Sequence, residues 1–397
     1  MKEPPRLHEI VDAAPLVVCL GPGGVGKTTI AAVLALRAAA AGQRALVLTI
    51  DPARRLADAL GVAGLTNDPT PVRAFEFLHP AGTLSALMLD PAATFDHLIA
   101  VLVPDVERRR KLLENRIYLQ LSRSLAGTLE YMAIERLHDI VVSEAYQGIV
   151  LDTPPTTNAL DFLDAPERAA RFFHERVTRW FVHRPERLSW TSRLFDRAGS
   201  TVLALLSRVV GEEFVSDMTA FFTAFGDLFG AFRARGERVS ALLRDRRTVF
   251  VIVASPDPYR LPEALEIDRR LVDAGCAPRA FIVNQVEEVF APEWLDLEAS
   301  TDAAASAIEA QAGRERVRAF VERLEAHRRA HHESARIHAE AVARLRAHAG
   351  NRPVFTAPRI PPGGGARESL LAIYQALFAR AASSADAAGQ TSGEARG

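Results

Sequence analysis

The sequence has few of the features that disulfide-linked, zinc-binding or nucleic-acid-binding proteins require. It contains only two cysteines, Cys19 and Cys276, and neither belongs to a C-x-x-C pair, which argues against a disulfide framework or a zinc site. The formal net charge is −1 and the isoelectric point is near 6.9. Electrostatics therefore give no reason to expect a nucleic acid as a partner.

Long apolar runs are also missing. No stretch reaches the roughly 18 uninterrupted apolar residues that a membrane span needs. The segment 1–15 carries charges and three prolines where a signal peptide would have an apolar core. We therefore expect a soluble, cytoplasmic protein without an integral membrane span. Hydrophobic residues still make up 48% of the chain, enough to bury a large α/β core.

The strongest motif is a glycine-rich loop that lies between an apolar run at 16–20 and an alanine-rich helical segment at 30–41. The residues that fit the pattern G-x-x-x-x-G-K-[ST] are Gly21, Gly26, Lys27 and Thr28. Glycines let backbone N–H groups surround an anion, and the following helix adds its positive end. Lys27 can reach the β- and γ-phosphates, and Thr28 can bind Mg²⁺. This context favours a nucleotide site over a structural turn.

Two aspartates follow buried strands. Asp51 ends the apolar run 45–50, and Asp152 ends the run 148–152. Ligands of doubly wound sheets gather at the carboxyl ends of strands, which predicts Asp51 near the phosphates. Asp51 before Pro52 also suits a helix N-cap, and the two interpretations are compatible. Asp152 has the position of a Walker B aspartate, which holds Mg²⁺ through a water. The alternative for Asp152 is a turn-forming residue.

Apolar runs alternate with helical segments along the chain. This order predicts an α/β fold with a doubly wound, mostly parallel sheet of about 7–8 strands, flanked by helices and carrying an inserted α-helical subdomain. The runs at 75–78 and 84–89 predict either an edge hairpin or two separate strands. The other expected strands are 16–20, 45–50, 148–152, 248–255, 280–285 and 353–359.

The same pattern divides the chain. The expected parts are the first section of the nucleotide-binding core (1–91), a helical segment (92–147), a core strand with its switch (148–164), a helical subdomain (165–245), the second section of the core (246–381) and a disordered tail (382–397). The helical subdomain repeats phenylalanines and other apolar residues at three- and four-residue steps between 214 and 232. Such a stripe is either buried core or a groove for an apolar partner. The histidines 327, 331, 332 and 338 favour a solvated helix face over a metal site.

Together these motifs resemble the anion-transporting ATPase family, which includes the arsenite-pump ATPases and the targeting ATPases of tail-anchored membrane proteins. The matching segments are 23–29 (deviant Walker A), 51–53 (switch I), 152–156 with 163–166 (switch II), 284–285 (adenine reading) and 358–359 (adenine-covering loop). The resemblance implies ATP and Mg²⁺ as cofactors. It implies that 165–245 holds the client-binding helices.

The resemblance also implies a role for each matched residue. Lys27 and Asp51 are the implied catalytic residues, with Asp51 orienting or deprotonating the attacking water. Thr28 and Asp152 are the implied Mg²⁺ residues. The implied nucleotide-binding residues are Gly23, Gly24, Val25, Gly26, Lys27, Thr28, Thr29, Asn284, Pro358 and Arg359.

Three departures from the family pattern stand out. Pro22 replaces the signature lysine that relatives extend across the dimer interface, so we expect Arg54 or Arg55, or a related subunit, to supply the charge. Thr157 and Asn158 stand where relatives have Gly-His. A thiolate cluster for arsenic and a C-x-x-C zinc clasp are both missing.

The expected function is an ATP-hydrolysing dimeric switch. Its helical subdomain would handle an apolar client helix or a membrane partner. The alternatives are a weakly hydrolysing regulatory subunit in a heterodimer and an energising subunit of a transporter. A homodimer and a heterodimer with a related ATPase subunit both remain open.

Overall fold

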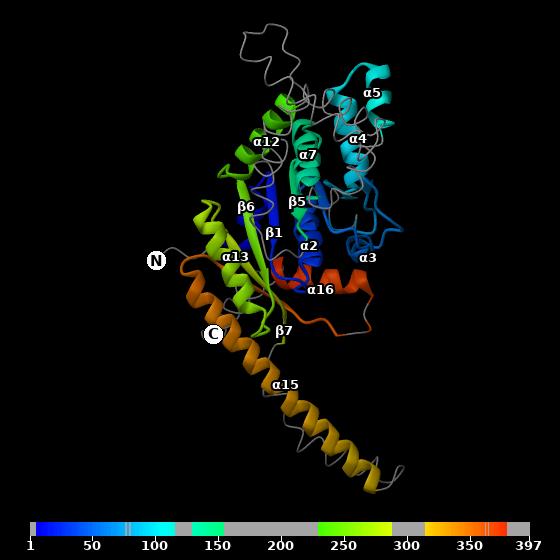
Figure 1. Cartoon of the computed structure of the whole chain (residues 1–397). Helices are drawn as coiled ribbons and strands as arrows, with labels where there is room; N and C mark the ends of the chain where they lie inside the picture. Colours follow the sequence, from blue (N-terminus) through cyan, green and yellow to red (C-terminus); the bar gives the residue numbers. More distant parts are fainter. Residues whose placement is uncertain are drawn as a thin grey trace, which may run out of the picture.

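A single eight-stranded sheet forms the centre of the molecule (Figure 1). The computed structural model describes residues 5–75, 78, 81–115, 129–154, 229–287, 314–361, 363 and 365–378. The strand order is β3-β4-β2-β5-β1-β6-β7-β8. The strands are β1 (Leu16–Leu20), β2 (Arg44–Thr49), β3 (Thr70–Pro71), β4 (Thr83–Met88), β5 (Gly148–Asp152), β6 (Thr248–Ala254), β7 (Ala280–Val286) and β8 (Val354–Pro358).

Neighbouring strands are parallel except at one edge, where β3 runs antiparallel to β4. The central strands β1, β5 and β6 are buried along their whole length, as expected of parallel strands that helices cover on both faces. The predicted fold class, an α/β protein with a mostly parallel sheet flanked by helices, is confirmed.

The strand at the antiparallel edge lies at other residues than the expected strand at 75–78. The strand that pairs with β4 is the two-residue β3, and Phe75 lies outside any strand. Its side chain is fully buried, and the Arg367 guanidinium carbon lies 5.9 Å from the centre of its ring. Phe75 thus packs in the core, and the strand that pairs with β4 lies a few residues before it in the chain.

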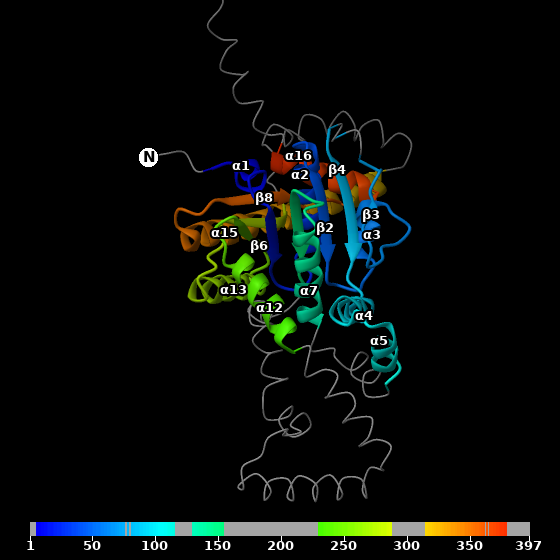
Figure 2. The same cartoon turned by 90° about the horizontal axis from the view of Figure 1, so that it is seen from above.

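The helices lie on both faces of the sheet, which Figure 2 shows from above. They are α1 (Leu7–Val11), α2 (Lys27–Ala40), α3 (Arg55–Leu60), α4 (Pro91–Leu102), α5 (Val106–Leu113), α7 (Leu129–Val142), α12 (Phe229–Leu243), α13 (Leu261–Asp273), α15 (Arg314–Ala349) and α16 (Ala366–Phe378). Residues of α1, α2, α3 and α16 share one hydrophobic cluster with the sheet, and residues of α4, α7, α12, α13 and α15 share the other.

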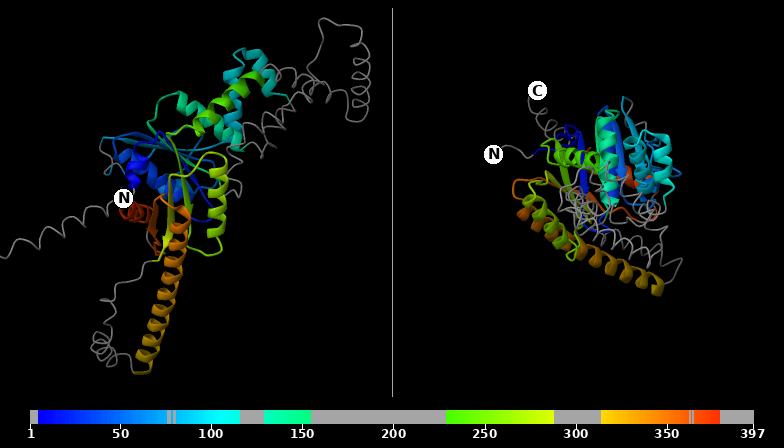
Figure 3. Two further views of the ribbon diagram at one scale, coloured as in Figure 1. Left: turned by 90° about the vertical axis from the view of Figure 1, so that its left-hand side faces the viewer. Right: turned by 45° about the horizontal axis from the view of Figure 1, so that its top comes forward.

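The 36-residue helix α15 is the most extended element. Its first half projects well beyond the sheet (Figure 3). Within the described parts of the chain, none of the helices combines the length and apolarity that crossing a bilayer requires. Most of the predicted phenylalanine stripe (214–228), the switch residues 157–158 and the predicted tail at 382–397 lie outside the described residues, while the last positions of the stripe, 229–232, begin α12.

Candidate nucleotide site

The glycine-rich loop leaves the central strand β1 and enters α2 at Lys27. Gly24 and Gly26 have φ angles of 75° and 84°, values that side-chain-bearing residues rarely adopt. A Cβ on Gly21 would lie only 2.1 Å from the carbonyl oxygen of Val253 in β6. The loop therefore needs glycine for its turns and also for its close contact with the neighbouring strand.

Lys27 points back into this loop. Its ammonium donates hydrogen bonds to the carbonyls of Gly21 at 2.9 Å and Pro22 at 2.8 Å. Burial lowers the pKa of Lys27, while the nearby carboxylates of Asp152 and Asp51 act in the opposite direction. A buried cation next to turned-in N–H groups is the chemistry that a nucleotide phosphate requires.

Asp152 is fully buried at the end of β5. Its Oδ2 accepts a hydrogen bond from the Thr49 hydroxyl at 2.9 Å. Burial raises the pKa of Asp152 to about 6, although Thr28, Thr49 and Lys27 each lower it. Its Oδ1 is buried and makes no hydrogen bond within the described part of the chain. A buried carboxylate with an unused oxygen, next to the Thr28 hydroxyl, fits the oxygen ligands that Mg²⁺ prefers.

Thr49 connects this carboxylate to Asp51. The same hydroxyl that donates to Asp152 accepts the backbone N–H of Asp51 at 3.2 Å. Oδ1 of Asp51 accepts the N–H of Ala53 at 3.0 Å, and α3 begins only at Arg55. Asp51 therefore stabilises the turn after β2, and the N-cap position of α3 belongs to Arg54. The interpretation of Asp51 as the helix cap is wrong.

The charged side chain of Arg55 lies near Asp51. Its Nη1 lies 3.4 Å from Oδ2 of Asp51, and its side chain is 65% exposed. The prediction that Arg54 or Arg55 replaces the missing lysine is not tested by this contact. The role of Thr49 between Asp152 and Asp51 was not predicted. A threonine at the end of an otherwise apolar strand could have indicated it.

The predicted adenine residues lie on β7 and β8, beyond β6. The Asn284 side chain is buried, and its Nδ2 donates to the carbonyl of Val25 at 3.0 Å. Its Oδ1 has no hydrogen-bond partner among the residues described. Arg359 follows Pro358 and reaches the end of β7 with its N–H donating to Val286 at 2.9 Å. The fold thus brings Asn284 into contact with the phosphate loop and places the 358–359 segment beside β7.

One histidine of α15 belongs to this region. Nδ1 of His338 accepts the backbone N–H of Glu287 at 2.9 Å, and Arg359 pairs with the carboxylate of Glu287 at 2.9 Å. Burial lowers the pKa of His338. His327 and His332 are exposed as predicted, but the predicted solvated position is wrong for His338, which anchors α15 to the end of β7.

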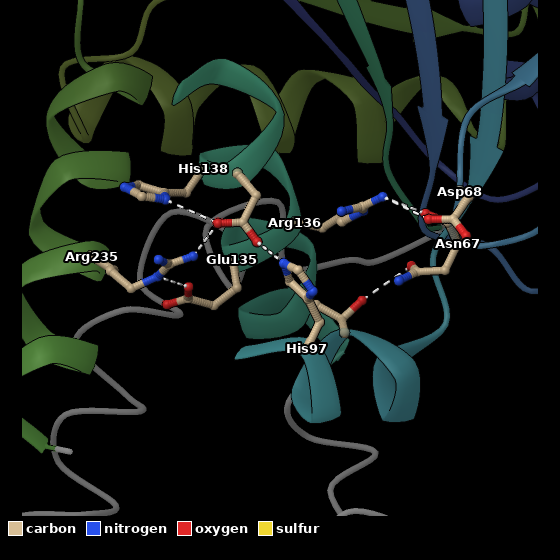
Figure 4. Close-up of polar contacts among 9 residues, drawn as sticks. Asn67, Asp68, His97, Glu135, Arg136, His138 and Arg235 are labelled. Atoms are coloured by element: carbon tan, nitrogen blue, oxygen red, sulfur yellow. Dashed lines mark hydrogen bonds and ion pairs between the residues drawn. The ribbon is translucent and has the colours of Figure 1, made fainter. Parts of the chain in front are cut away.

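A second polar cluster lies outside this site, between α4, α7 and α12 (Figure 4). Arg235 of α12 donates to the buried Glu135 of α7 at 2.6 Å and to Asp139 one turn later. His97 of α4 lies 3.6 Å from the other oxygen of Asp139. The cluster connects three helices. Arg235 and Glu135 are 100 residues apart in the chain, so no local sequence pattern indicates their pairing.

Comparison with known proteins identifies the family of the chain. The model of the anion-transporting ATPase family matches residues 15–293, which include the loop, Asp51, Asp152 and Asn284. ATPase GET3 of Malassezia globosa is 32% identical over 291 residues, or 72% of this chain and 77% of that protein. Protein Rv2184c of Mycobacterium tuberculosis is 31% identical over 273 residues, or 67% of this chain and 58% of that protein.

A further relative, an uncharacterized Streptomyces coelicolor protein, SCO2128, is 30% identical over 278 residues, or 69% of this chain and 64% of that protein. The matched region thus spans less than two thirds of the Mycobacterium and Streptomyces relatives. The family match nevertheless covers well over half of this chain and includes all the central strands. The resemblance read from the motifs is confirmed: the chain belongs to the anion-transporting ATPase family.

Proposed function

We propose that the chain binds ATP with Mg²⁺ and hydrolyses it, and that it acts as a nucleotide-dependent switch. The observation that carries this proposal is the buried Asp152, whose Oδ1 lacks a hydrogen bond within the described residues. It lies beside Lys27 and Thr28 at the start of α2. An unpaired buried carboxylate oxygen is costly to stability, which suits a residue whose partner is a ligand.

Each residue of the site has a role in this proposal. N–H groups of residues 23–29 would hold the phosphates, with Lys27 near the β- and γ-phosphates. Thr28 and Asp152 would hold Mg²⁺, which when bound neutralises phosphate charge. Asp51 would orient the attacking water and accept its proton. The new bond joins the water oxygen to the γ-phosphorus, and ADP leaves with the electron pair of the broken bond.

The base would lie at the carboxyl ends of β7 and β8. In this proposal Asn284 reads adenine, because its amide can offer one donor and one acceptor to the base edge. Its Oδ1 is buried and makes no bond with the described residues, so a base amino group would satisfy it. Pro358 and Arg359 would cover the ring from the end of β8.

The helices give a route from this site to the proposed helical subdomain. Asp152 ends β5, and β5 follows α7 after a short connection. Arg235 joins α7 to α12, and α12 lies within the proposed subdomain 165–245. A shift of the end of β5 when the γ-phosphate leaves would therefore reach α12 through paired charges. An apolar client helix or a membrane partner at that subdomain, and a dimer of two ATPase subunits, complete the proposal.

Steady-state hydrolysis of ATP tests the first step. Lys27→Ala and Asp51→Asn should each lower kcat by about 10²- to 10³-fold, as when a group that stabilises a transition state is removed. The matched control is Arg318→Ala, which removes an exposed arginine from the projecting part of α15. Equal turnover in wild type and both site variants would exclude hydrolysis at this site.

Two further measurements address the finer parts. Sedimentation with ATP and with ADP should show a nucleotide-dependent dimer; a monomer under both conditions would contradict the homodimer and leave the heterodimer with a related subunit. Retention of a single hydrophobic helix by wild type and not by Lys27→Ala would support the client proposal. Equal retention by both would contradict the coupling of the client to nucleotide.

A further inference from the structure

A second cation, besides Lys27, contacts the phosphate loop. Arg260 stands immediately before α13, in the turn that follows the central strand β6. Its guanidinium Nη1 donates a hydrogen bond to the carbonyl of Gly23. The side chain is 44% exposed, so the guanidinium lies at the open surface of the loop. No sequence motif assigns a role to Arg260.

The position of Arg260 is fixed by its surroundings. Oδ1 of Asp257 accepts the N–H of Tyr259 at 2.8 Å, and Oδ2 of Asp257 lies 3.7 Å from Nε of Arg260. A Cβ on Gly24 would lie 2.5 Å from Nη1 of Arg260. Gly24 therefore leaves room for the guanidinium directly against the loop.

Two other cations near the loop also have partners within the chain. Lys27 donates to two loop carbonyls, and Arg55 pairs with Asp51 at 3.4 Å. The hydrogen bond of Arg260 goes to a neutral peptide carbonyl, which is a weaker acceptor than a phosphate oxygen. A guanidinium can also bind two phosphate oxygens at once. A phosphate in the loop would therefore compete successfully for Arg260.

We propose that Arg260 is a phosphate-binding residue of this site. Its guanidinium exchanges the Gly23 carbonyl for the terminal phosphate oxygens of ATP and stabilises the charge that builds up there during hydrolysis. It thereby supplies a positive charge to the loop that Pro22 cannot provide. This inference rests on the proposed function of the chain as an ATPase.

The test compares ligands that differ in the terminal phosphate. The affinities of wild type, Arg260→Ala and Arg260→Lys for ADP and for the non-hydrolysable β,γ-imido analogue of ATP are measured by calorimetry, together with kcat and KM for ATP. Arg269→Ala is the matched control, since Arg269 lies on α13 and pairs at the surface with Glu266 at 2.9 Å. A double variant, Arg54→Ala with Arg55→Ala, tests the competing source of charge.

Arg260→Ala should weaken binding of the ATP analogue by about 10-fold or more relative to ADP and should lower kcat by at least as much. Arg260→Lys should recover part of both losses, and Arg269→Ala should match wild type. If Arg260→Ala weakens the binding of ADP and of the analogue equally, or weakens the binding of neither, Arg260 only stabilises the loop and the inference is overturned.

The same holds if only the Arg54/Arg55 double variant loses its preference for the analogue. Measurements on the wild-type protein distinguish a failure of this inference from a failure of the proposed function. A wild type that binds and hydrolyses ATP, with Arg260→Ala unchanged, removes the inference alone. A wild type that binds neither nucleotide removes both.

Discussion

Two buried aspartates on opposite sides of the sheet have opposite surroundings. Asp268 of α13 is saturated: both of its oxygens accept from the Arg352 guanidinium, at 2.5 and 2.8 Å, and one also contacts Nε2 of His348 at 2.7 Å. Asp152 accepts the Thr49 hydroxyl with Oδ2, and its Oδ1 has no hydrogen-bond partner among the described residues. Asp268 is 2% exposed and Asp152 is 0% exposed, so burial alone does not distinguish them.

The two carboxylates differ in how far the rest of the chain compensates their charge. Asp268 joins α13 to the end of α15 and the turn beyond it, and Arg352 also stacks 4.9 Å from the centre of the Phe281 ring. Its charge is compensated within the chain, as in a structural ion pair. The charge of Asp152 is compensated only partly, which is why burial raises its pKa to about 6. Incomplete pairing of a buried carboxylate is thus the better guide to a ligand site.

The largest expected effect comes from the substitution of Asp152. Asp152→Asn should lower the rate of MgATP hydrolysis by about 10²- to 10³-fold, without lowering the melting temperature of the nucleotide-free protein. Removing a partly paired buried charge relieves a desolvation cost. Turnover and thermal unfolding of the same preparation measure both quantities. A large loss of stability would show that Asp152 is as structural as Asp268.

Asp268→Asn should have the reverse effect. It leaves Arg352 without its charged partner, so we expect the free energy of unfolding to fall by about 3 kcal/mol, while kcat per folded molecule stays unchanged. Denaturant unfolding and active-site titration give the two numbers. Asp245→Asn is the control, because Asp245 pairs with Arg247 at the surface and its loss should change stability little. An equal effect of both changes would contradict the structural role of Asp268.

The cluster between α7 and α12 offers an intermediate case. Arg235→Ala removes the guanidinium bound to the buried Glu135 and should cost about 2 kcal/mol of unfolding free energy. If the cluster transmits nucleotide state, the variant should also hydrolyse ATP without the client response of the wild type. Arg235→Lys keeps the charge and should restore most of the stability. A variant with normal stability would exclude the cluster as a connection between the helices.

The smallest expected effect is a pH dependence at His338. Burial lowers its folded-state pKa below the usual 6.5, so its contribution is present above about pH 6.5 and is lost as pH falls toward the folded pKa. Protonation of Nδ1 would end its acceptance of the Glu287 N–H. Melting temperatures between about pH 7.5 and pH 5.5 should fall less for His338→Asn, whose amide oxygen can accept the same bond without titrating. Identical pH profiles would contradict this account.

Spacing in the sequence was enough to find the loop, Asp51 and Asp152, because each lies at the end of a buried strand and parallel strands end at one edge. Asn284 was found through the family resemblance. The structure brings these residues together as that rule predicts. Thr49 and Arg260 were not found, since their roles depend on contacts between elements. Arg260 and Gly23 are separated by 237 positions in the chain. The partners of Asp268 are about 80 positions away, and no local pattern indicates such pairs.

The two ends of the sheet restrict how copies of the chain can associate. The edge strand β3 has only two residues and ends at Pro71, while β8 ends at Pro358 and is preceded by Pro353. Short strands and prolines at an edge hinder the addition of a strand from another molecule. A continuous intermolecular sheet is therefore disfavoured at both borders. Two subunits would have to meet through loops and helices, which can separate and reclose without breaking a backbone ladder.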